Sequence, residues 1–295
     1  MTALEQEQAQ AREAWEGIAA GYDDFVTSTH LWVGNEAAVR AGLGPGQRFL
    51  DVAAGSGALS IPAARLGASV VATDISPTML ERLAARAAAE GLADVETQVM
   101  DGHELRFADD SFDVAGSQFG VMLLPDLPRA MRELARVTRP GGRVLFVVLG
   151  PPTQIEFITF FLGAIQAVVP GFEGLPSDPP PLPFQVAEVE QQRAALEAVG
   201  LRDVQIEEVT ERLPFDSGQE MWSWLVNSNP VAGHLIEDLS EEQRAQVRRE
   251  LDGMLRRRAG GSETAVLTNA IHIGIGTVPG GEASLVAANR AGIAR

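Results

Sequence analysis

The sequence predicts an α/β fold built on a parallel, doubly wound sheet. Apolar segments alternate with helical segments through the first 150 residues, which is the pattern of such sheets. The first apolar segment runs into a glycine turn at Gly55 and Gly57. The next two apolar segments end in the acids Asp74 and Asp101. Glycine lets a backbone turn sharply beside a ligand, and a carboxylate at a strand tip suits a ribose diol, so we expect a nucleoside-binding βαβ unit.

Each element of the first half follows from a local signal. A helix is expected at 3–20, where Ala11, Ala14, Trp15 and Ile18 recur at three-to-four spacing. Ser76 as the cap and Pro77 at the first helical position predict a helix that ends at Gly91. Strands are expected at 47–53, 69–73, 95–100, 112–117 and 143–149, and a further helix at 126–138.

After Gly150 this alternation ends. An apolar, aromatic-rich helix is expected at 153–169, followed by a proline-rich loop at 170–183. Ser240 and Gln243 form a capping-box pattern, which predicts the start of a helix that runs to Arg258. The remaining expected elements are a helix at 187–200, a strand at 204–213, a strand at 265–278 and a small-residue tail beyond 279.

Composition narrows the functional classes. The 295 residues contain no cysteine, which excludes a disulfide framework, a thiolate metal site and a cysteine nucleophile, and we expect no metal site. The formal net charge of −17 argues against a nucleic-acid substrate, because such binding needs a cationic surface. The first 20 residues carry no apolar signal core, and no apolar run reaches about 18 residues. A cytoplasmic protein without a membrane span is therefore expected.

Five segments carry a resemblance to a known family. They are the glycine loop at 51–57, the acid Asp74, the step at 100–102, the strand at 112–119 and the Arg-Pro-Gly-Gly-Arg segment within 133–146. Together they resemble a class I S-adenosylmethionine-dependent methyltransferase, of the group that includes the ubiquinone and menaquinone C-methylating enzymes. A nicotinamide dehydrogenase fits less well, because Ser60 replaces the third glycine of its fingerprint. Such an enzyme also needs no acid after the third strand, where this chain has Asp101.

The resemblance implies a Rossmann-like sheet of seven strands, mostly parallel, whose last two strands pair as an antiparallel hairpin at one edge. It also implies a helical lid and an insertion that caps the substrate. The implied organisation is a lid at 1–45, a cofactor-binding core at 46–150, a substrate cap at 151–186, a C-terminal part of the core with helical cap elements at 187–280, and a tail at 281–295.

The same resemblance implies the cofactor, S-adenosyl-L-methionine, with S-adenosyl-L-homocysteine as the product, and a role for each matched position. Asp74 would accept hydrogen bonds from the ribose, and Asp101 from the adenine amino group. Tyr22 would close over the cofactor, and Gln118 would lie near the transferred methyl group. The other expected contacts are Asp51, Ala53, Gly55 and Gly57 at the methionine portion, and Ile75, Met79 and Gly102 at the adenine.

The sequence says less about the residues that would bind the methyl acceptor. Phenol or enol acceptors lose a proton, for which histidine suits neutral pH, so His30 and His234 are candidate bases; many enzymes of this fold use none. An aromatic-lined pocket is expected from Trp32, Phe157, Phe160, Phe161 and Trp222.

These features predict direct methyl transfer to a small hydrophobic metabolite: O- or C-methylation of a quinone precursor, polyketide or other secondary metabolite. The protein is expected to be a monomer or a homodimer. A protein that binds the cofactor without transferring the methyl group, such as a cyclase or a regulatory module, remains the alternative.

Overall fold

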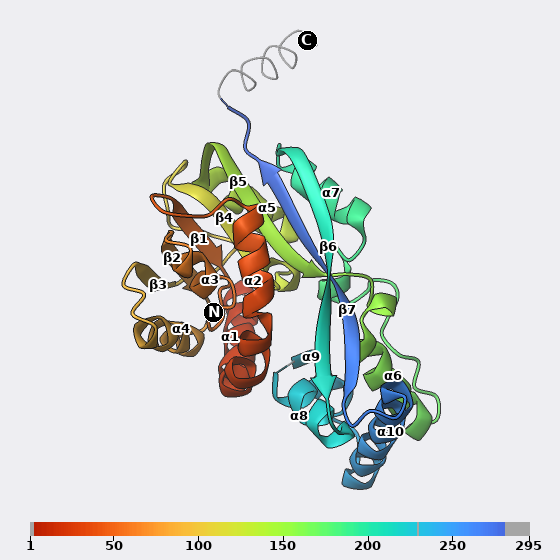
Figure 1. Cartoon of the computed structure of the whole chain (residues 1–295). Helices are drawn as coiled ribbons and strands as arrows, with labels where there is room; N and C mark the ends of the chain where they lie inside the picture. The colour runs from red at the N-terminus through yellow and green to blue at the C-terminus, as the bar shows by residue number, and fades with distance from the viewer. Residues whose placement is uncertain (1–2, 229, 281–295) are drawn as a thin grey trace, which may run out of the picture.

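The computed structural model describes residues 3–228 and 230–280, and its centre is a seven-stranded sheet (Figure 1). The strand order is β3-β2-β1-β4-β5-β7-β6; the first five strands run parallel, and β7 is antiparallel to both β5 and β6. This confirms the predicted fold class. The strands are β1 (Arg48–Val52), β2 (Ser69–Asp74), β3 (Val95–Val99), β4 (Phe112–Gln118), β5 (Thr138–Leu149), β6 (Arg202–Phe215) and β7 (Ala265–Thr277).

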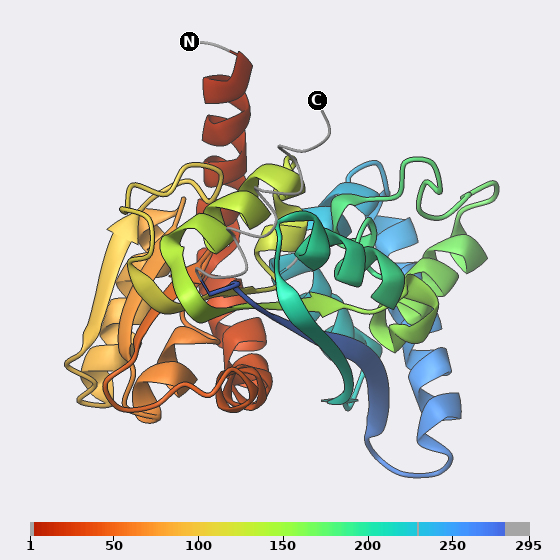
Figure 2. The same cartoon turned by 90° about the horizontal axis from the view of Figure 1, so that it is seen from above.

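Helices cover both faces of the sheet, as Figure 2 shows from above. One face carries α2 (Ser28–Arg40), α3 (Ser60–Arg65) and α4 (Pro77–Ala89); the other carries α5 (Leu127–Val137) and α7 (Val189–Ala198). Strands covered on both faces read as continuous apolar segments, which explains why β1, with Phe49 and Leu50 fully buried, was predictable from sequence.

Two boundaries differ from the sequence predictions by three residues or more. β5 begins at Thr138, five residues before the expected start, because Thr138 already pairs with Phe112 of β4, and Gly141 and Gly142 exchange backbone hydrogen bonds with Val278. The helix expected from 153 begins at Glu156, since a short 3₁₀ turn at Pro152–Gln154 precedes it. The predicted caps are present: the Ser76 hydroxyl accepts from the Met79 amide, and Ser240 and Gln243 form the capping box.

A second layer of helices, the cap, lies below the sheet in Figure 1. It consists of α6 (Glu156–Val168), α8 (Gly218–Ser228), α9 (Pro230–Leu235) and α10 (Glu241–Ala259), together with the ends of β6 and β7. β5 ends at Leu149, opposite Ile271, whereas the β6–β7 hairpin continues to the pair Phe215 and Ala265. The extended hairpin therefore provides the strand surface on which the cap helices pack.

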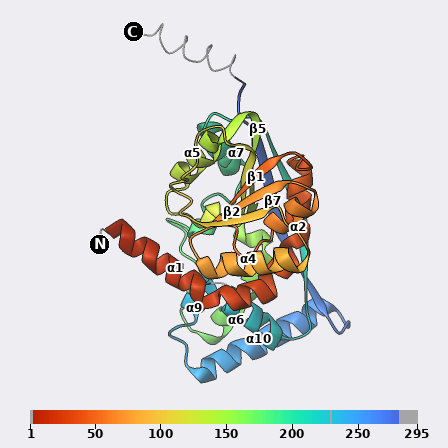
Figure 3. The ribbon, with the colours of Figure 1, turned by 90° about the vertical axis from the view of Figure 1, so that its left-hand side faces the viewer.

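The N-terminal helix α1 (Ala3–Gly21) connects core and cap. Figure 3 shows it crossing α4, and it also contacts α8 and α9. A π-helical turn, Tyr22–Thr27, joins it to α2. Such turns inside α-helices are frequent at functional sites. No helix in the described ranges is long and apolar enough to cross a membrane, and the expected tail at 281–295 lies outside those ranges.

Close packing behind β7 gives a first test. A Cβ at Gly274 would lie 2.6 Å from the buried ring of Phe146, so Gly274→Ala should lower the free energy of unfolding by about 1–3 kcal/mol. Gly17→Ala on α1 meets nothing within 4 Å and should stabilise the helix by about 0.5–1 kcal/mol. Urea denaturation measures both; equal stability of the two variants would contradict the packing.

Candidate functional site

A cavity of about 520 Å³ opens at the carboxyl ends of the parallel strands. This edge of a doubly wound sheet is where ligands bind in such folds. The glycine turn, the tips of β2, β3 and β4, and the lid all contribute to its wall. The lining residues that the sequence analysis named are Tyr22, Ala53, Gly55, Asp74, Ile75, Met79, Asp101, Gly102 and Gln118.

The glycine turn has the backbone geometry that only glycine adopts freely. Gly55 has φ +54° and Gly57 has φ +102°. A Cβ at Gly57 would also lie 3.0 Å from Leu83, which shows how closely the turn packs on α4. Ala53 has φ +54° as well, a conformation that costs a non-glycine residue energy and that concentrates at functional sites.

The carboxylate of Asp74 joins three elements. Its Oδ2 accepts from the Gly55 amide at 2.9 Å, and its Oδ1 accepts from the Ser76 amide at 2.9 Å. Burial raises its pKa, and the amides of Ser76 and Gly55 oppose that rise. The acid thus fixes the glycine turn to the tip of β2 and the start of α4, while the residue still faces the cavity.

Asp51 lies behind the cavity wall and does not line it. The residue is fully buried, and the Ser60 hydroxyl donates to its Oδ2 at 2.6 Å, whereas its Oδ1 has no hydrogen-bond partner within the described ranges. Burial, with a further contribution from the charge of Asp74, raises the pKa of Asp51 to about 7. A cation that enters the cavity near these two acids would therefore favour their ionised form.

Asp101 begins the loop that follows β3. Its Oδ1 accepts from the His103 amide at 2.9 Å and lies 2.8 Å from His103 Nδ1. The Asp126 amide donates to His103 Nε2 at 3.3 Å. One nitrogen of His103 therefore lies beside an acceptor and the other beside a donor. The histidine connects the expected adenine site to the start of α5.

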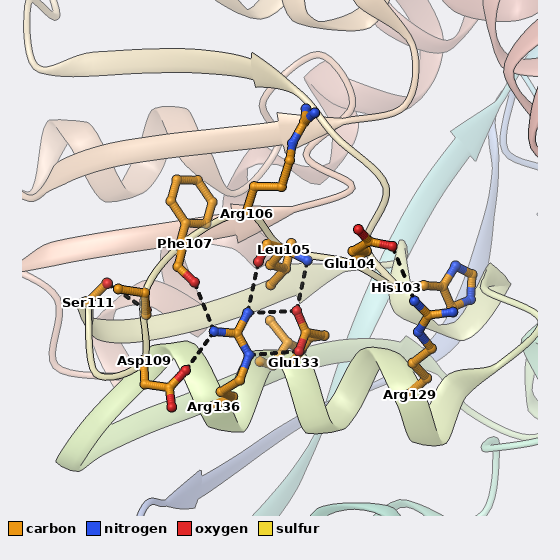
Figure 4. Close-up of polar contacts among 12 residues, drawn as sticks. His103, Glu104, Leu105, Arg106, Phe107, Asp109, Ser111, Arg129, Glu133 and Arg136 are labelled. Carbon is orange, nitrogen blue, oxygen red and sulfur yellow. Dashed lines mark hydrogen bonds and ion pairs between the residues drawn. The ribbon is translucent and has the colours of Figure 1, made fainter.

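Glu133 and Arg136 of α5 hold the same loop from below, as Figure 4 shows. Glu133 Oε2 accepts from the Leu105 amide at 2.8 Å. Arg136 donates to the carbonyls of Leu105 and Phe107, both at 2.8 Å, and to Glu133. These charge-assisted bonds fix the loop against α5. Both residues lie in the segment 133–146 that carries part of the family resemblance, but the sequence alone assigns neither of them a role.

The N-terminal segment that is expected to act as a lid is attached to the core at two points. The hydroxyls of Thr27 and Ser56 lie 2.5 Å apart, which ties the π-helical turn to the glycine turn. Asp23 pairs with Arg86 at 2.5 Å and with Arg82 at 3.3 Å, both on α4. These contacts hold the lid over the mouth of the cavity.

A second, apolar cavity of about 280 Å³ adjoins the first, on the side of the cap. The two share lining residues, among them Trp15, Tyr22 and Phe119. Phe119 follows β4 with φ +58°, a strained conformation at the junction of the cavities. The other walls come from α6, α8 and the proline-rich loop, with Phe157, Ile158, Phe161, Leu162, Leu175, Pro181, Pro183, Phe184, Trp224 and Leu225.

His30 lies in the wall of the second cavity but is not placed to act as a base. Its Nδ1 lies 2.7 Å from the Val26 carbonyl and its Nε2 lies 2.8 Å from Glu211 Oε1. Burial alone would lower the pKa of His30, but the Glu211 carboxylate and the Val26 carbonyl outweigh it, and the pKa is raised. The Thr29 hydroxyl lies 3.1 Å from Nδ1 as well. With an acceptor beside each nitrogen, a ring that carries a proton on both has none free to take a proton from a substrate.

Other expected positions fall elsewhere. Trp32 is 39% exposed on α2 and lines neither cavity, and Gly57, although in the turn, lies behind the wall. Phe160 and Trp222 pack within the cap rather than on the cavity. The side chain of His234 lies outside the described part of the structure.

Helical geometry explains what the sequence analysis missed on the acceptor side. Trp222 and Trp224 are two residues apart on α8 and so face different directions. Trp224 lines the cavity, whereas Trp222 packs against Phe161. Glu211 gave no local signal, because its partner His30 is 181 positions away in the chain.

Comparison with known proteins agrees with this geometry. A family model described as a methyltransferase domain matches residues 50–146. An uncharacterized protein of Mycobacterium tuberculosis is 53% identical over 104 residues, and that match covers 35% of this chain and only 38% of the relative. A demethylmenaquinone methyltransferase of Mycobacterium bovis is 35% identical over 174 residues, with 57% of this chain and 70% of the relative covered.

The chain belongs to the class I S-adenosylmethionine-dependent methyltransferases of the ubiquinone and menaquinone type. A crystal structure of the YcgJ protein from Bacillus subtilis shares the fold of this methyltransferase, with a TM-score of 0.55 and 18% identity. The alignment covers 85% of the methyltransferase and 99% of the Bacillus chain. At that identity the likeness concerns the fold alone.

The clamp on the loop after β3 gives a second test. Arg136→Ala removes the bonds to the Leu105 and Phe107 carbonyls, so the loop should loosen and the affinity for S-adenosylmethionine should fall on the order of tenfold. Arg132→Ala is the matched control, because this arginine is exposed on the same helix. Calorimetric titration compares the two; equal affinities would show that the clamp does not support the site.

Proposed function

We propose that this protein transfers a methyl group from S-adenosylmethionine to a small hydrophobic acceptor. The observation that carries the proposal is the pair of adjoining cavities, one lined by acids and the glycine turn, the other almost wholly apolar. They meet at Tyr22 and Phe119, where a donor in the first and an acceptor in the second would touch. Bringing two reactants into line in this way is the main requirement of a displacement reaction.

The residues of the first cavity fit the proposed donor. Asp51 Oδ1 and Gln118 Oε1 are buried acceptors without a hydrogen-bond partner in the described residues. A buried acceptor without a donor costs the folded protein free energy, and an ammonium or sulfonium group nearby would offset that cost. Gly102 also fits, because a Cβ there would lie 2.9 Å from Leu124 and 3.0 Å from Val52, which leaves no space for a side chain.

S-adenosylmethionine, when bound, supplies a methyl group that is already activated on its sulfonium. In the proposal, Asp74 accepts from the ribose hydroxyls and Asp101 from the adenine amino group. Ile75 and Met79 flank the adenine, and the turn from Ala53 to Gly57 passes the methionine portion. Tyr22 closes the cavity from the lid; burial raises the pKa of its phenol further above neutral pH, so it remains a neutral donor.

The lining of the second cavity favours an acceptor that is mostly apolar. Aromatic and aliphatic side chains from α6, α8 and the proline-rich loop make its walls. Such a wall suits a small hydrophobic metabolite, for example a quinone precursor or a polyketide, and offers nothing for a charged polymer. The relative from Mycobacterium bovis is named for a menaquinone precursor, which supports the same class.

Replacing the ribose acid tests the donor side. Asp74→Ala removes a charged acceptor and the anchor of the glycine turn, so affinity for S-adenosylmethionine should fall about 10- to 100-fold. Asp94→Ala, an exposed acid at the start of β3, is the control and should bind normally. Calorimetry measures both, and circular dichroism checks that each variant is folded. Unchanged affinity in a folded Asp74→Ala would refute the ribose assignment.

Filling the second cavity tests the acceptor side. Leu162→Trp places a larger ring in the cavity wall, so methylation of apolar acceptors should fall at least about tenfold while S-adenosylmethionine affinity stays the same. Thr159→Trp, exposed on the same helix, should leave both unchanged.

The readout for that pair is the mass of products formed from isotope-labelled S-adenosylmethionine and a panel of apolar hydroxyl-bearing acceptors. Cofactor binding without any product of increased mass would favour the non-methylating alternative, a cyclase or a regulatory module. Equal loss in both tryptophan variants would show that the second cavity is not the acceptor site.

A further inference from the structure

A buried ion pair lies directly behind the wall of the apolar cavity. Glu211 on β6 is 0% exposed, and its Oε1 lies 2.8 Å from Nε2 of His30, which lines the cavity. The other ring nitrogen lies 2.7 Å from the Val26 carbonyl. The Thr29 hydroxyl also lies 3.1 Å from His30 Nδ1, but its own proton has acceptors in the Phe25 and Val26 carbonyls, at 3.0 and 2.9 Å. A carbonyl and a carboxylate both only accept, so this arrangement fits an imidazolium that carries a proton on each ring nitrogen.

The pair is fixed by its neighbours. The Asn269 amide on β7 donates to Glu211 Oε2 at 2.9 Å, and the amide of Phe157, at the start of α6, donates to Asn269 Oδ1 at 3.3 Å. The ring of His30 packs edge-to-face on Phe119 at 5.1 Å. One polar network therefore joins α2, β6, β7 and α6, and Phe119 packs on its histidine ring.

The imidazolium faces an otherwise uncharged space. Among the described residues that line the apolar cavity, His30 and Tyr22 are the titratable ones, and Tyr22 is neutral. Glu211 is the carboxylate that faces the ring, and the ring separates it from the cavity. A ligand in the cavity therefore meets the positive end of the pair first. Buried ion pairs cost desolvation, so this one needs a reason beyond stability.

We propose that Glu211 is a positioning residue that holds His30 as an imidazolium, and that this charge makes the cavity select acceptors with an acidic hydroxyl, bound as the phenolate or enolate. The inference rests on the proposed methyl transfer. An anion in an apolar cavity is costly alone, and a positive charge within about 4–6 Å offsets that cost. The hydroxyl proton leaves to solvent on binding, so no base is needed in the cavity.

In the methyl transfer, one bond to the methyl carbon forms as another breaks. The anion's electron pair, on oxygen or on the adjacent ring or enol carbon, forms the new bond to the methyl carbon. The carbon–sulfur bond breaks, and its electrons remain on sulfur, which becomes the thioether of S-adenosylhomocysteine. With a carbon nucleophile, the hydrogen on that carbon is lost to solvent afterwards, as the ring regains its aromaticity or the ketone its enol form.

The test uses the whole protein and 4-nitrophenol, whose phenolate absorbs visible light. Bound to the wild type, the probe should ionise at a pH about one unit lower than the free probe does. Glu211→Gln should abolish this shift, and the loss corresponds to about tenfold weaker binding of the phenolate. Glu208→Gln, exposed on the same strand, should keep the shift. 4-Nitroanisole, which has no ionisable hydroxyl, should bind wild type and Glu211→Gln equally.

A measurement without variants covers the case in which Glu211→Gln does not fold. Nuclear magnetic resonance of the four histidines should show His30 still protonated at a pH where an unperturbed histidine is already neutral. A His30 that is already neutral at pH 7 would overturn the inference, as would a phenolate shift that survives in Glu211→Gln. If neither nitroaromatic binds, the acceptor cavity of the proposed function is wrong instead.

Discussion

The glycine turn, the tip of β2 and the start of α4 are joined through one buried carboxylate, that of Asp74. Both of its oxygens accept backbone amides, from Gly55 and Ser76, at 2.9 Å. Gly55 and Gly57 adopt their positive φ without strain, whereas Ala53, at φ +54°, is a strained residue of the turn that those bonds help to hold. The cavity keeps its form because the acid that would contact the ribose also holds the turn in place.

The acceptor side depends on a different constraint, the length of the β6–β7 hairpin. It continues past the end of β5 and carries the cap helices beside the cofactor edge of the sheet. The same hairpin delivers Glu211 and Asn269 beneath the lid residue His30. One extension therefore provides both the apolar walls and the buried charge, and couples the lid to the cap.

The core was predictable from sequence because its signals are local. A buried parallel strand reads as an apolar segment, and Ser76-Pro77 and Ser240-Glu-Glu-Gln243 specify helix starts over three or four residues. The acids at strand tips were equally readable, and nine of the eleven expected cofactor residues line the first cavity. Asp51 and Gly57 lie just behind it, since they support the turn instead of facing the space.

The cap and the acceptor wall were less predictable because they depend on pairs far apart in the chain. Trp32 and Trp224 look alike in sequence, and only the packing decides that the first faces solvent and the second the cavity. From the sequence, His30 is a candidate base, because its partner lies far away in the chain. Glu211 of β6 lies 2.8 Å from its ring and helps to raise its pKa.

Calorimetric titration shows directly whether the first cavity binds S-adenosylmethionine. We expect micromolar binding of S-adenosylmethionine and S-adenosylhomocysteine, as is usual for enzyme ligands, and no binding of NAD. Binding of NAD alone, or of none of the three, would contradict this expectation.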